Sequence, residues 1–408
     1  MAYRALRNYG TASPVSFINR QHRVAIVGGG AAGLSISHQL LRSGNFTKDD
    51  IAVIDPSTNH DYQPGWTLVG GGLKHKDDLR KSLVGLLDQK IKFYNEPVRT
   101  FFPEDNSITL GDGVKINYEQ LVVVPGIKIN YDSIQGLPEA LSNPDSFVST
   151  IYSYDTCDKV FKAVQKLQRG NAIFTQPTGI IKCAGAPQKA MWLALDYWKR
   201  AGLYNPSNPS GSPINISFAT GLPSMFGVPK YSAKLEELRQ QRGVEGLFQH
   251  DLVAISGNTA VFSGPGESSL ASDAGFVDVD ECTTRHTKYH NVWSIGDASN
   301  LPTSKTTAAI TSQAPVLVEN LLLALEGKLA QATYDGYTSC PLITEYGKVL
   351  LAEFKYGGVP KETFAMLGID QASPRRAFYH LKKDFFSWVY YKAMVKGTWG
   401  GPRGWIRK

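Results

Sequence analysis

The feature that most constrains this chain is the segment from Val24 to Leu41, VAIVGGGAAGLSISHQLL. Its first four residues are apolar and have the length and composition of a buried parallel strand. Gly28, Gly30 and Gly33 then follow with the spacing G-x-G-x-x-G, and a helix is predicted to begin beside them. In this spacing the first glycine allows a tight turn, the second lets the backbone approach a pyrophosphate, and the third lets the helix pack closely on the strand.

A second apolar run, Ile51–Ile54, predicts the next strand, and Asp55 follows it directly. An acidic residue at this position can accept a hydrogen bond from a ribose hydroxyl. The glycine spacing alone could belong to an unrelated helix start. Strand, glycines, helix, strand and acid in this order predict a binding site for an adenine dinucleotide.

A second fingerprint lies far along the chain. Val292–Ile295 predicts a strand that ends in Gly296 and Asp297, and a helix is predicted from Thr306 to Leu325. Asp297 can accept a hydrogen bond from a ribityl hydroxyl, which FAD has and NADH lacks. The N-terminus of the helix would stabilise negative charge on a reduced flavin. A strand followed by a simple aspartate turn is the alternative, but the two fingerprints together predict FAD.

Between the fingerprints lies a second strand–helix pattern, with a short strand after Asn171 and an amphipathic helix from Pro187 to Arg200. The loop between them reads TQPTGIIKCAGAP, in which Gly179 and Gly185 are too far apart for a phosphate loop. We therefore expect a second Rossmann-like unit without an NAD glycine loop. Further strands are predicted at 214–218 and 247–256, with a helix over 231–242 between them.

The predicted fold class is α/β, with two Rossmann-like dinucleotide-binding domains. The FAD-binding domain is discontinuous, the second domain is inserted in it, and a C-terminal membrane-associating helical segment follows. The expected boundaries are 23–140 and 265–327 for the FAD domain, 141–264 for the second domain and 328–408 for the C-terminal region. Residues 1–22 are basic, rich in hydroxyl groups and free of acids, which predicts a mitochondrial targeting segment; a disordered N-terminus is the alternative.

The distribution of charge along the chain indicates which kinds of binding partner to expect. The net charge of +7 is not gathered in one basic stripe and accompanies no nucleic-acid module, so no nucleic-acid partner is expected. The tail, KKDFFSWVYYKAMVKGTWGGPRGWIRK, mixes aromatic side chains with lysines, which suits a membrane interface; a helix docked on the body is the alternative. Because no uninterrupted run of 18 apolar residues occurs, no transmembrane helix is predicted.

The four cysteines do not form C-x-x-C, and their spacing predicts no metal site. An enzyme of this layout without an NAD loop needs another route for electrons, and a thiol pair is a candidate. Cys183 lies beside Lys182 and just before a predicted helix, an environment that lowers a thiol pKa. Cys340 lies in a turn-rich stretch before a proline, whereas Cys157 and Cys282 match no catalytic motif and are expected to be structural.

Five stretches make the chain resemble the sulfide:quinone oxidoreductase family of two-dinucleotide-binding-domain flavoproteins. They are YQP at 62–64, IIKCAGAPQK at 180–189, LPTSKT at 301–306, YDGYTSCPL at 334–342 and WGGP at 399–402. The resemblance implies that hydrogen sulfide is oxidised to sulfane sulfur on a Cys183–Cys340 disulfide. Electrons would pass through FAD to ubiquinone, and a thiol or sulfite would take the sulfur, at the mitochondrial inner membrane surface.

The resemblance also implies roles for individual residues. Cys340 would carry the persulfide, and Cys183 would be the thiolate that faces the flavin. Beside the fingerprint glycines, the implied FAD contacts are Ala31, Ala32, Asp55, Gln63, Val98, Asp297, Lys305, Thr306, Thr307 and Ala308.

The chain departs from the family pattern at 257–278, where about one strand is missing. Two other functions therefore stay open at this point. One is a type II NADH:quinone oxidoreductase, against which the absent glycine loop argues. The other is a non-catalytic FAD-binding protein, inactivated by the shortened segment. The oligomeric state is not predicted.

Overall fold

The structure is a computed structural model of the 408-residue chain and describes residues 19–179, 181–264 and 275–399. The predicted targeting segment lies outside the described residues up to residue 18. Its last four residues belong to strand β1 (Asn19–Val27), where Asn19 pairs with Lys115 of β8. Residues 19–22 therefore pair within the first sheet, because the strand extends beyond its apolar core.

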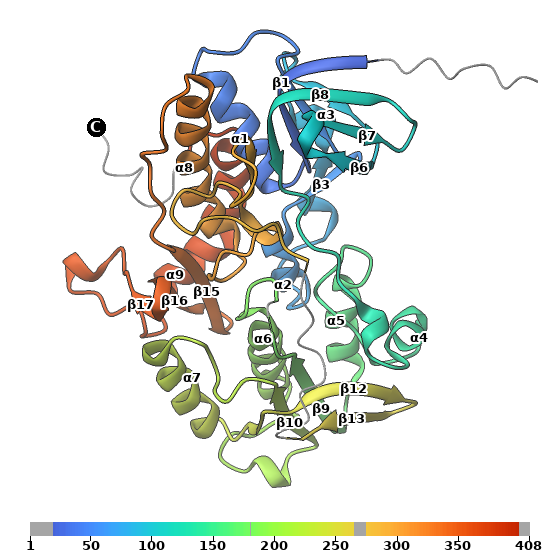
Figure 1. The fold of residues 1–408 in the computed structure, drawn as a ribbon. Helices are drawn as coiled ribbons and strands as arrows, with labels where there is room; N and C mark the ends of the chain where they lie inside the picture. The colour runs from blue at the N-terminus through green and yellow to red at the C-terminus, as the bar shows by residue number, and fades with distance from the viewer. Residues whose placement is uncertain (1–18, 180, 265–274, 400–408) are drawn as a thin grey trace, which may run out of the picture.

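A mixed seven-stranded sheet forms the first domain (Figure 1). Its order is β5-β2-β1-β8-β7-β6, with β14 paired on β8. β1 is parallel to β2 and β8, whereas β6, β7 and β8 form an antiparallel meander. The other bounds are β2 (Ile51–Ile54), β5 (Lys92–Tyr94), β6 (Val98–Phe102), β7 (Ser107–Leu110), β8 (Lys115–Val123) and β14 (Val292–Trp293). This parallel core confirms the predicted Rossmann-like domain.

The glycine loop has the geometry that its spacing requires. Gly28 has a φ of +110°, in a region that favours glycine, and it makes the turn from β1 toward helix α1 (Ala31–Arg42). A Cβ at Gly33 would lie 1.9 Å from the carbonyl oxygen of Gly28. The absence of a side chain at Gly33 is what lets α1 pack directly on the end of β1.

Helix α8 (Thr307–Leu325) packs beside α1 against the first sheet (Figure 1). Its buried residues, which include Ala314 and Leu317, share a core cluster with Ile36 and Trp293. Among the described residues, α8 is the one helix whose length and apolar composition would let it cross a membrane, and half of that stretch is buried in the molecule. Its contacts make it a core helix.

The second domain is built on a three-stranded parallel sheet of order β11-β10-β9, as predicted for an inserted Rossmann-like unit. Its elements are α5 (Cys157–Lys166), β9 (Gly170–Gln176), α6 (Ala186–Arg200), β10 (Ile214–Thr220), α7 (Pro229–Gln241) and β11 (Glu245–Phe248). Trp192 and Trp198 of α6 are fully buried against this sheet.

The single strand predicted over 247–256 is wrong. Gln249 has a φ of +57°, and this left-handed residue separates β11 from β12 (Asp251–Ser256). β12 pairs antiparallel with β13 (Thr259–Ser263) as a two-stranded hairpin. The shortened segment begins in the turn of this hairpin and includes β13, and its residues 265–274 lie outside the described residues.

The C-terminal region forms a third sheet and a helical tail. β15 (Thr338–Glu345), β16 (Lys348–Lys355) and β17 (Val359–Pro360) are antiparallel, and β15 packs on α6. The tail runs through α9 (Arg376–His380), η9 (Leu381–Phe385), α10 (Phe386–Val389) and η10 (Tyr390–Met394). The smaller elements are β3 (Asn59–Asp61), α2 (Trp66–Val69), β4 (Arg80–Ser82), α3 (Leu83–Leu86) and α4 (Leu137–Ser142).

One face of the tail is part of the protein core. Tyr390 and Val395 are buried in a cluster with Leu34 of α1. The Tyr390 hydroxyl lies 2.7 Å from Nε2 of buried His60. The alternative of a helix docked on the body therefore holds for this face, and a complete truncation of the tail would open the first domain.

We predict that Gly33→Ala destabilises the protein by at least about 2 kcal/mol, because overpacking a close backbone contact carries a cost of this order. The new Cβ would overlap the Gly28 carbonyl oxygen at 1.9 Å. Urea unfolding measures the effect. Gly85→Ala, at an exposed position of α3, is the control, because the nearest atom to its Cβ would lie 3.7 Å away. Equal stability of the two variants would contradict the close-packing explanation.

Candidate active site

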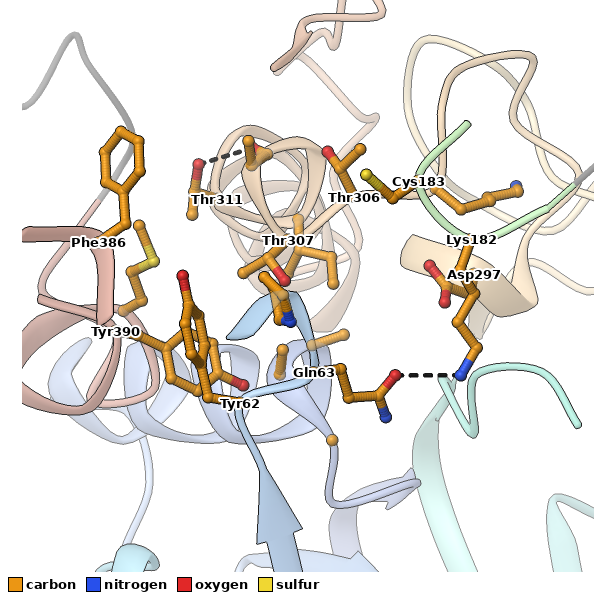
Figure 2. Close-up of a pocket in the computed structure, with 18 of the residues that line it drawn as sticks. Tyr62, Gln63, Lys182, Cys183, Asp297, Thr306, Thr307, Thr311, Phe386 and Tyr390 are labelled. Atoms are coloured by element: carbon orange, nitrogen blue, oxygen red, sulfur yellow. Dashed lines mark hydrogen bonds between the residues drawn. The ribbon is translucent and has the colours of Figure 1, made fainter. Parts of the chain in front are cut away.

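A cavity of about 430 Å³ lies where the first domain, the second domain and the tail meet. Its walls come from segments far apart in the sequence. Figure 2 shows Lys182 and Cys183 on one side, Phe386 and Tyr390 on the other, and the threonines of α8 between them. The cavity lies beyond the carboxyl ends of the parallel strands, the usual ligand position in such sheets.

The glycine loop forms one end of this cavity. Gly30 lines it, and a Cβ at Gly30 would have no atom within 4 Å, so the backbone is open to close approach by a ligand. Ala31 and Ala32 begin α1, whose first turn holds no acidic residue. The free amides and the dipole of this helix end therefore favour an anion such as a pyrophosphate.

Asp55 also lines the cavity, and its carboxylate has contacts of its own. Oδ2 accepts a hydrogen bond from the Gly29 amide at 2.7 Å, and Oδ1 accepts one from the Ser57 amide at 2.7 Å. These bonds fix the carboxylate at the cavity wall, where each oxygen keeps a further lone pair for a hydroxyl donor.

The N-terminus of α8 forms another wall of the cavity, beside α1. Thr306 caps the helix, since its Oγ1 accepts from the Ala309 amide at 3.1 Å, and Thr307 and Ala308 face the cavity. Nearby, burial raises the pKa of Asp297, and Lys182 donates to Gln63 Oε1 at 3.0 Å. This wall offers helix amides, amide side chains and a carboxylate to a polar ring edge and a hydroxylated chain.

Lys305 directly precedes Thr306, the N-cap of α8, and its side chain is held by carbonyl groups of the preceding loop. Its Nζ donates to the carbonyl oxygens of Ser299 and Leu301. Burial lowers the pKa of Lys305 to about 8. The residue therefore secures the segment before α8 as well as lining the cavity.

These features fit a flavin dinucleotide. Two helix N-termini without acidic first turns, α1 and α8, both meet the cavity. The buried indole Nε1 of Trp66, another lining residue, has no hydrogen-bond partner among the described residues.

The two predicted redox cysteines lie together. Their Sγ atoms are 3.4 Å apart, although 157 positions separate them in the sequence, and the structure holds them as two thiols. Cys183 lines the cavity, and Cys340 is buried directly behind it. A pair at this distance can form a disulfide by a small movement of the sulfurs.

The backbone around Cys183 is constrained by its own conformation and by hydrogen bonds from neighbouring segments. Its φ of +49° is left-handed, its amide donates to Lys305 O at 2.8 Å, and its carbonyl accepts from Ala186 at 2.7 Å. The Tyr152 hydroxyl donates to the carbonyl of Lys182 at 3.1 Å. These bonds hold the thiol at the N-terminus of α6 and at the cavity wall.

The two thiols have different acidities. The hydrogen bond with Cys340, together with the charges of Lys189 and Lys382, lowers the pKa of Cys183 well below its usual range despite burial. The same contact and burial raise the pKa of Cys340. Lys189 is buried, and its Nζ donates to Cys183 Sγ at 3.3 Å. Burial lowers the pKa of Lys189, but the charge of the thiolates outweighs this and raises it overall.

The third sheet divides the cysteine pair from a further part of the cavity. Cys340 points to the α6 side, whereas Ser339, Pro341 and Glu353 line the cavity on the other face. Lys382 of the tail reaches this part, where burial and then the charge of Lys189 lower the pKa of Lys382 to about 7. Phe364 and Phe386 add aromatic walls.

Comparison with known proteins agrees with this geometry. The family model for pyridine nucleotide-disulphide oxidoreductases matches residues 22–172. The mitochondrial sulfide:quinone oxidoreductase of Schizosaccharomyces pombe is 42% identical, over 96% of this chain and 94% of its own length. The mouse enzyme is 37% identical, over 93% and 88%. The chain belongs to the sulfide:quinone oxidoreductase family.

The fold agrees with that of a solved family member. The sulfide:quinone oxidoreductase of Aquifex aeolicus has a TM-score of 0.65, at 18% identity, and covers 91% of this chain and 92% of its own. The alignment with the S. pombe sulfide:quinone oxidoreductase extends over 436 residues, more than the 408 of this chain. That relative therefore has segments without a counterpart in this chain.

Most of the residues that the family resemblance implied lie at the cavity. Four do not line it. Gly28 and Gly33 fix the shape of the glycine loop by their close packing, Val98 lies in β6, and Cys340 is buried behind Cys183. Cys157 is buried in α5, and Cys282 is exposed.

Sequence reasoning missed Tyr152, Lys189, Glu353 and Lys382. The contact of Lys189 with Cys183 could have been predicted, because Lys189 lies six residues after Cys183, in the first turn of α6. Tyr152, Glu353 and Lys382 reach the site only through tertiary contacts, which no local sequence pattern indicates.

We predict that Lys189→Met raises the pKa of Cys183 by at least about one unit, which is a tenfold change in thiolate fraction below that pKa. The reason is the loss of the ammonium 3.3 Å from the sulfur. The pH profile of Cys183 alkylation in reduced protein, read by mass spectrometry, measures it. Lys199→Met, at the exposed end of α6, is the control. An unchanged profile in the Lys189 variant would show that other groups set the acidity.

Proposed function

We propose that the protein is a mitochondrial, FAD-dependent sulfide:quinone oxidoreductase that oxidises hydrogen sulfide to sulfane sulfur. The observation that carries this proposal is the contact between the Cys183 and Cys340 sulfurs at 3.4 Å, at the wall of a cavity suited to a flavin dinucleotide. Membership of the sulfide:quinone oxidoreductase family supports it independently.

The difference in acidity between the thiols gives the first step a direction. HS⁻ attacks Cys340 Sγ of the oxidised pair, the S–S bond breaks, and Cys183 leaves with the electron pair as a thiolate. Cys340 then holds a persulfide, –S–SH. A thiol of low pKa is the better leaving group, and the environment of Cys183 lowers its pKa. Lys189 stabilises the thiolate that forms, because its ammonium already contacts that sulfur.

The second step removes the sulfur. A nucleophilic acceptor, a thiolate or sulfite, attacks the outer sulfur of the persulfide, and Cys340 leaves as a thiolate. The two thiolates then carry the two electrons of the original sulfide. Loss of these two electrons from the thiolates re-forms the disulfide. FAD, when bound, supplies a two-electron acceptor that can pass these electrons to a quinone, which also takes up two protons. The proposed holders of FAD are the loop at Gly30, Asp55, Gln63, Asp297 and the start of α8.

The other face of the third sheet suits the quinone. This part of the cavity has the aromatic walls Phe364 and Phe386 and the buried amino group of Lys382. A planar ring with carbonyl acceptors needs such surroundings. Because the tail forms one wall, a quinone dissolved in the membrane would reach this part directly if the tail lies on the membrane surface. We propose this position at the inner membrane for the exposed face of the tail.

The competing functions differ in their electron donor. A type II NADH:quinone oxidoreductase needs a phosphate loop between β9 and α6, where this chain has the Cys183 loop. A non-catalytic FAD-binding protein would bind the flavin without reacting with sulfide. Anaerobic addition of sulfide, and separately of NADH, to the purified flavoprotein distinguishes all three. We expect bleaching of the flavin by sulfide alone, and bleaching by NADH alone would overturn the proposal.

We predict that Cys183→Ser and Cys340→Ser each abolish sulfide-driven bleaching while FAD remains bound. A serine hydroxyl forms no disulfide and is a poor leaving group at neutral pH. Stopped-flow absorbance under anaerobic conditions measures the loss. Cys282→Ser, at an exposed cysteine, and Cys157→Ser, at a buried one in α5, should retain the wild-type rate within a few-fold. Normal bleaching in either of the first two variants would end the thiol-relay mechanism.

A further inference from the structure

An apolar tip projects from the segment between β17 and α9. Its short helical turn, η8 (Ala365–Leu367), leaves Met366 86% and Leu367 72% exposed. Ala365 and Gly368 on either side are exposed too, so that four consecutive residues without charge face solvent. Single exposed apolar residues are common, but adjacent ones this prominent indicate an interaction surface.

The tip is rigidly mounted. The Phe364 ring packs on Phe378 at 5.6 Å between centroids, and the Phe364 amide donates to buried Gln371 at 2.7 Å. Gly368 closes the turn in the left-handed region, with a φ of +67°. Because the base is anchored in this way, Met366 and Leu367 are held away from the body instead of folding back onto it. Figure 1 shows this segment, orange-red, projecting at the left of the molecule.

Two cations lie near the base of the tip. Arg375 and Arg376 are exposed at the start of α9, the helix whose Phe378 packs on Phe364. Trp388 of α10, in the tail, is 59% exposed. An apolar projection with cations near its base is complementary to an anionic lipid surface. A protein partner would not require this pairing of apolar tip and cationic rim.

The tip also borders the cavity. Phe364, two residues before Met366, lines the same part of the cavity as Phe386 of α10. A lipid surface that contacted both the tip and Trp388 would therefore lie against the quinone end of the cavity described above.

We propose that Met366 and Leu367 insert into the lipid surface and form a second membrane anchor beside the tail. The location of this anchor rests on the tip itself. Its use, to hold the cavity mouth against the source of a lipid-soluble quinone, rests on the proposed function.

The test is cosedimentation of the full-length flavoprotein with phosphatidylcholine vesicles that contain cardiolipin. We expect the Met366→Glu, Leu367→Glu double variant to bind the vesicles at least about tenfold more weakly than wild type, since two apolar insertions are lost. Leu329→Glu is the matched control, because Leu329 is 82% exposed beyond the far end of α8 and should bind as wild type. Equal binding by the double variant and the wild type would overturn the proposal.

Two further measurements keep the test sharp. Leu367→Trp places a reporter at the tip, and its fluorescence should be quenched by vesicles of brominated phosphatidylcholine; absence of quenching would also overturn the proposal. Light scattering should give the same mass for wild type and double variant, and dissociation of a wild-type dimer by the glutamates would assign the tip to a second copy instead.

Sulfide-driven flavin bleaching in detergent separates this proposal from the function. The double variant should bleach as wild type does, because Met366 and Leu367 do not line the cavity. If wild type fails to bleach but the tip variants lose vesicle binding, the anchor stands and the proposed function fails.

Discussion

The site depends on one close approach, between the start of helix α6 and strand β15. Gly185 makes it possible, since a Cβ there would lie 2.1 Å from Leu342 Cδ2 and 2.8 Å from Cys340 Sγ. Without this contact the second domain and the C-terminal sheet could not bring Cys183 and Cys340 together. The same contact places both thiols at the positive end of the α6 dipole, where thiolates are stabilised.

Burial gives the electrostatics of the pair its strength. Lys189 is buried and Cys183 is partly buried, so that an unpaired ammonium would be costly there and a paired one stabilises the thiolate strongly. In the part of the chain that the structure describes, no thiol lies within hydrogen-bond distance of Lys382, and its Nζ donates instead to the carbonyl of Pro64 at 3.0 Å. The lowered pKa of Lys382 and the raised pKa of Lys189 follow from this difference in partners.

The tail joins these parts into one site. Its inner face completes the core of the first domain through Tyr390, while Lys382 and Phe386 close the cavity. Its outer face, with Trp388 exposed, is left for a surface outside the molecule. A segment that is both a core element and a cavity wall couples the position of the tail to the geometry of the site.

The sequence by itself determined the first domain, the flavin fingerprints and the two cysteine motifs. These are local patterns: the strand–glycine–helix–strand order fixes backbone geometry within a few residues, as the contact at Gly33 illustrates. Only the tertiary structure decided the 3.4 Å contact between sulfurs, the ammonium of Lys189 on Cys183, and the approach of Tyr152 and Lys382. It also decided that one face of the tail is core and that β11 ends at Gln249. These features arise from side chains that meet across separate elements, and no local periodicity encodes which elements will pack together.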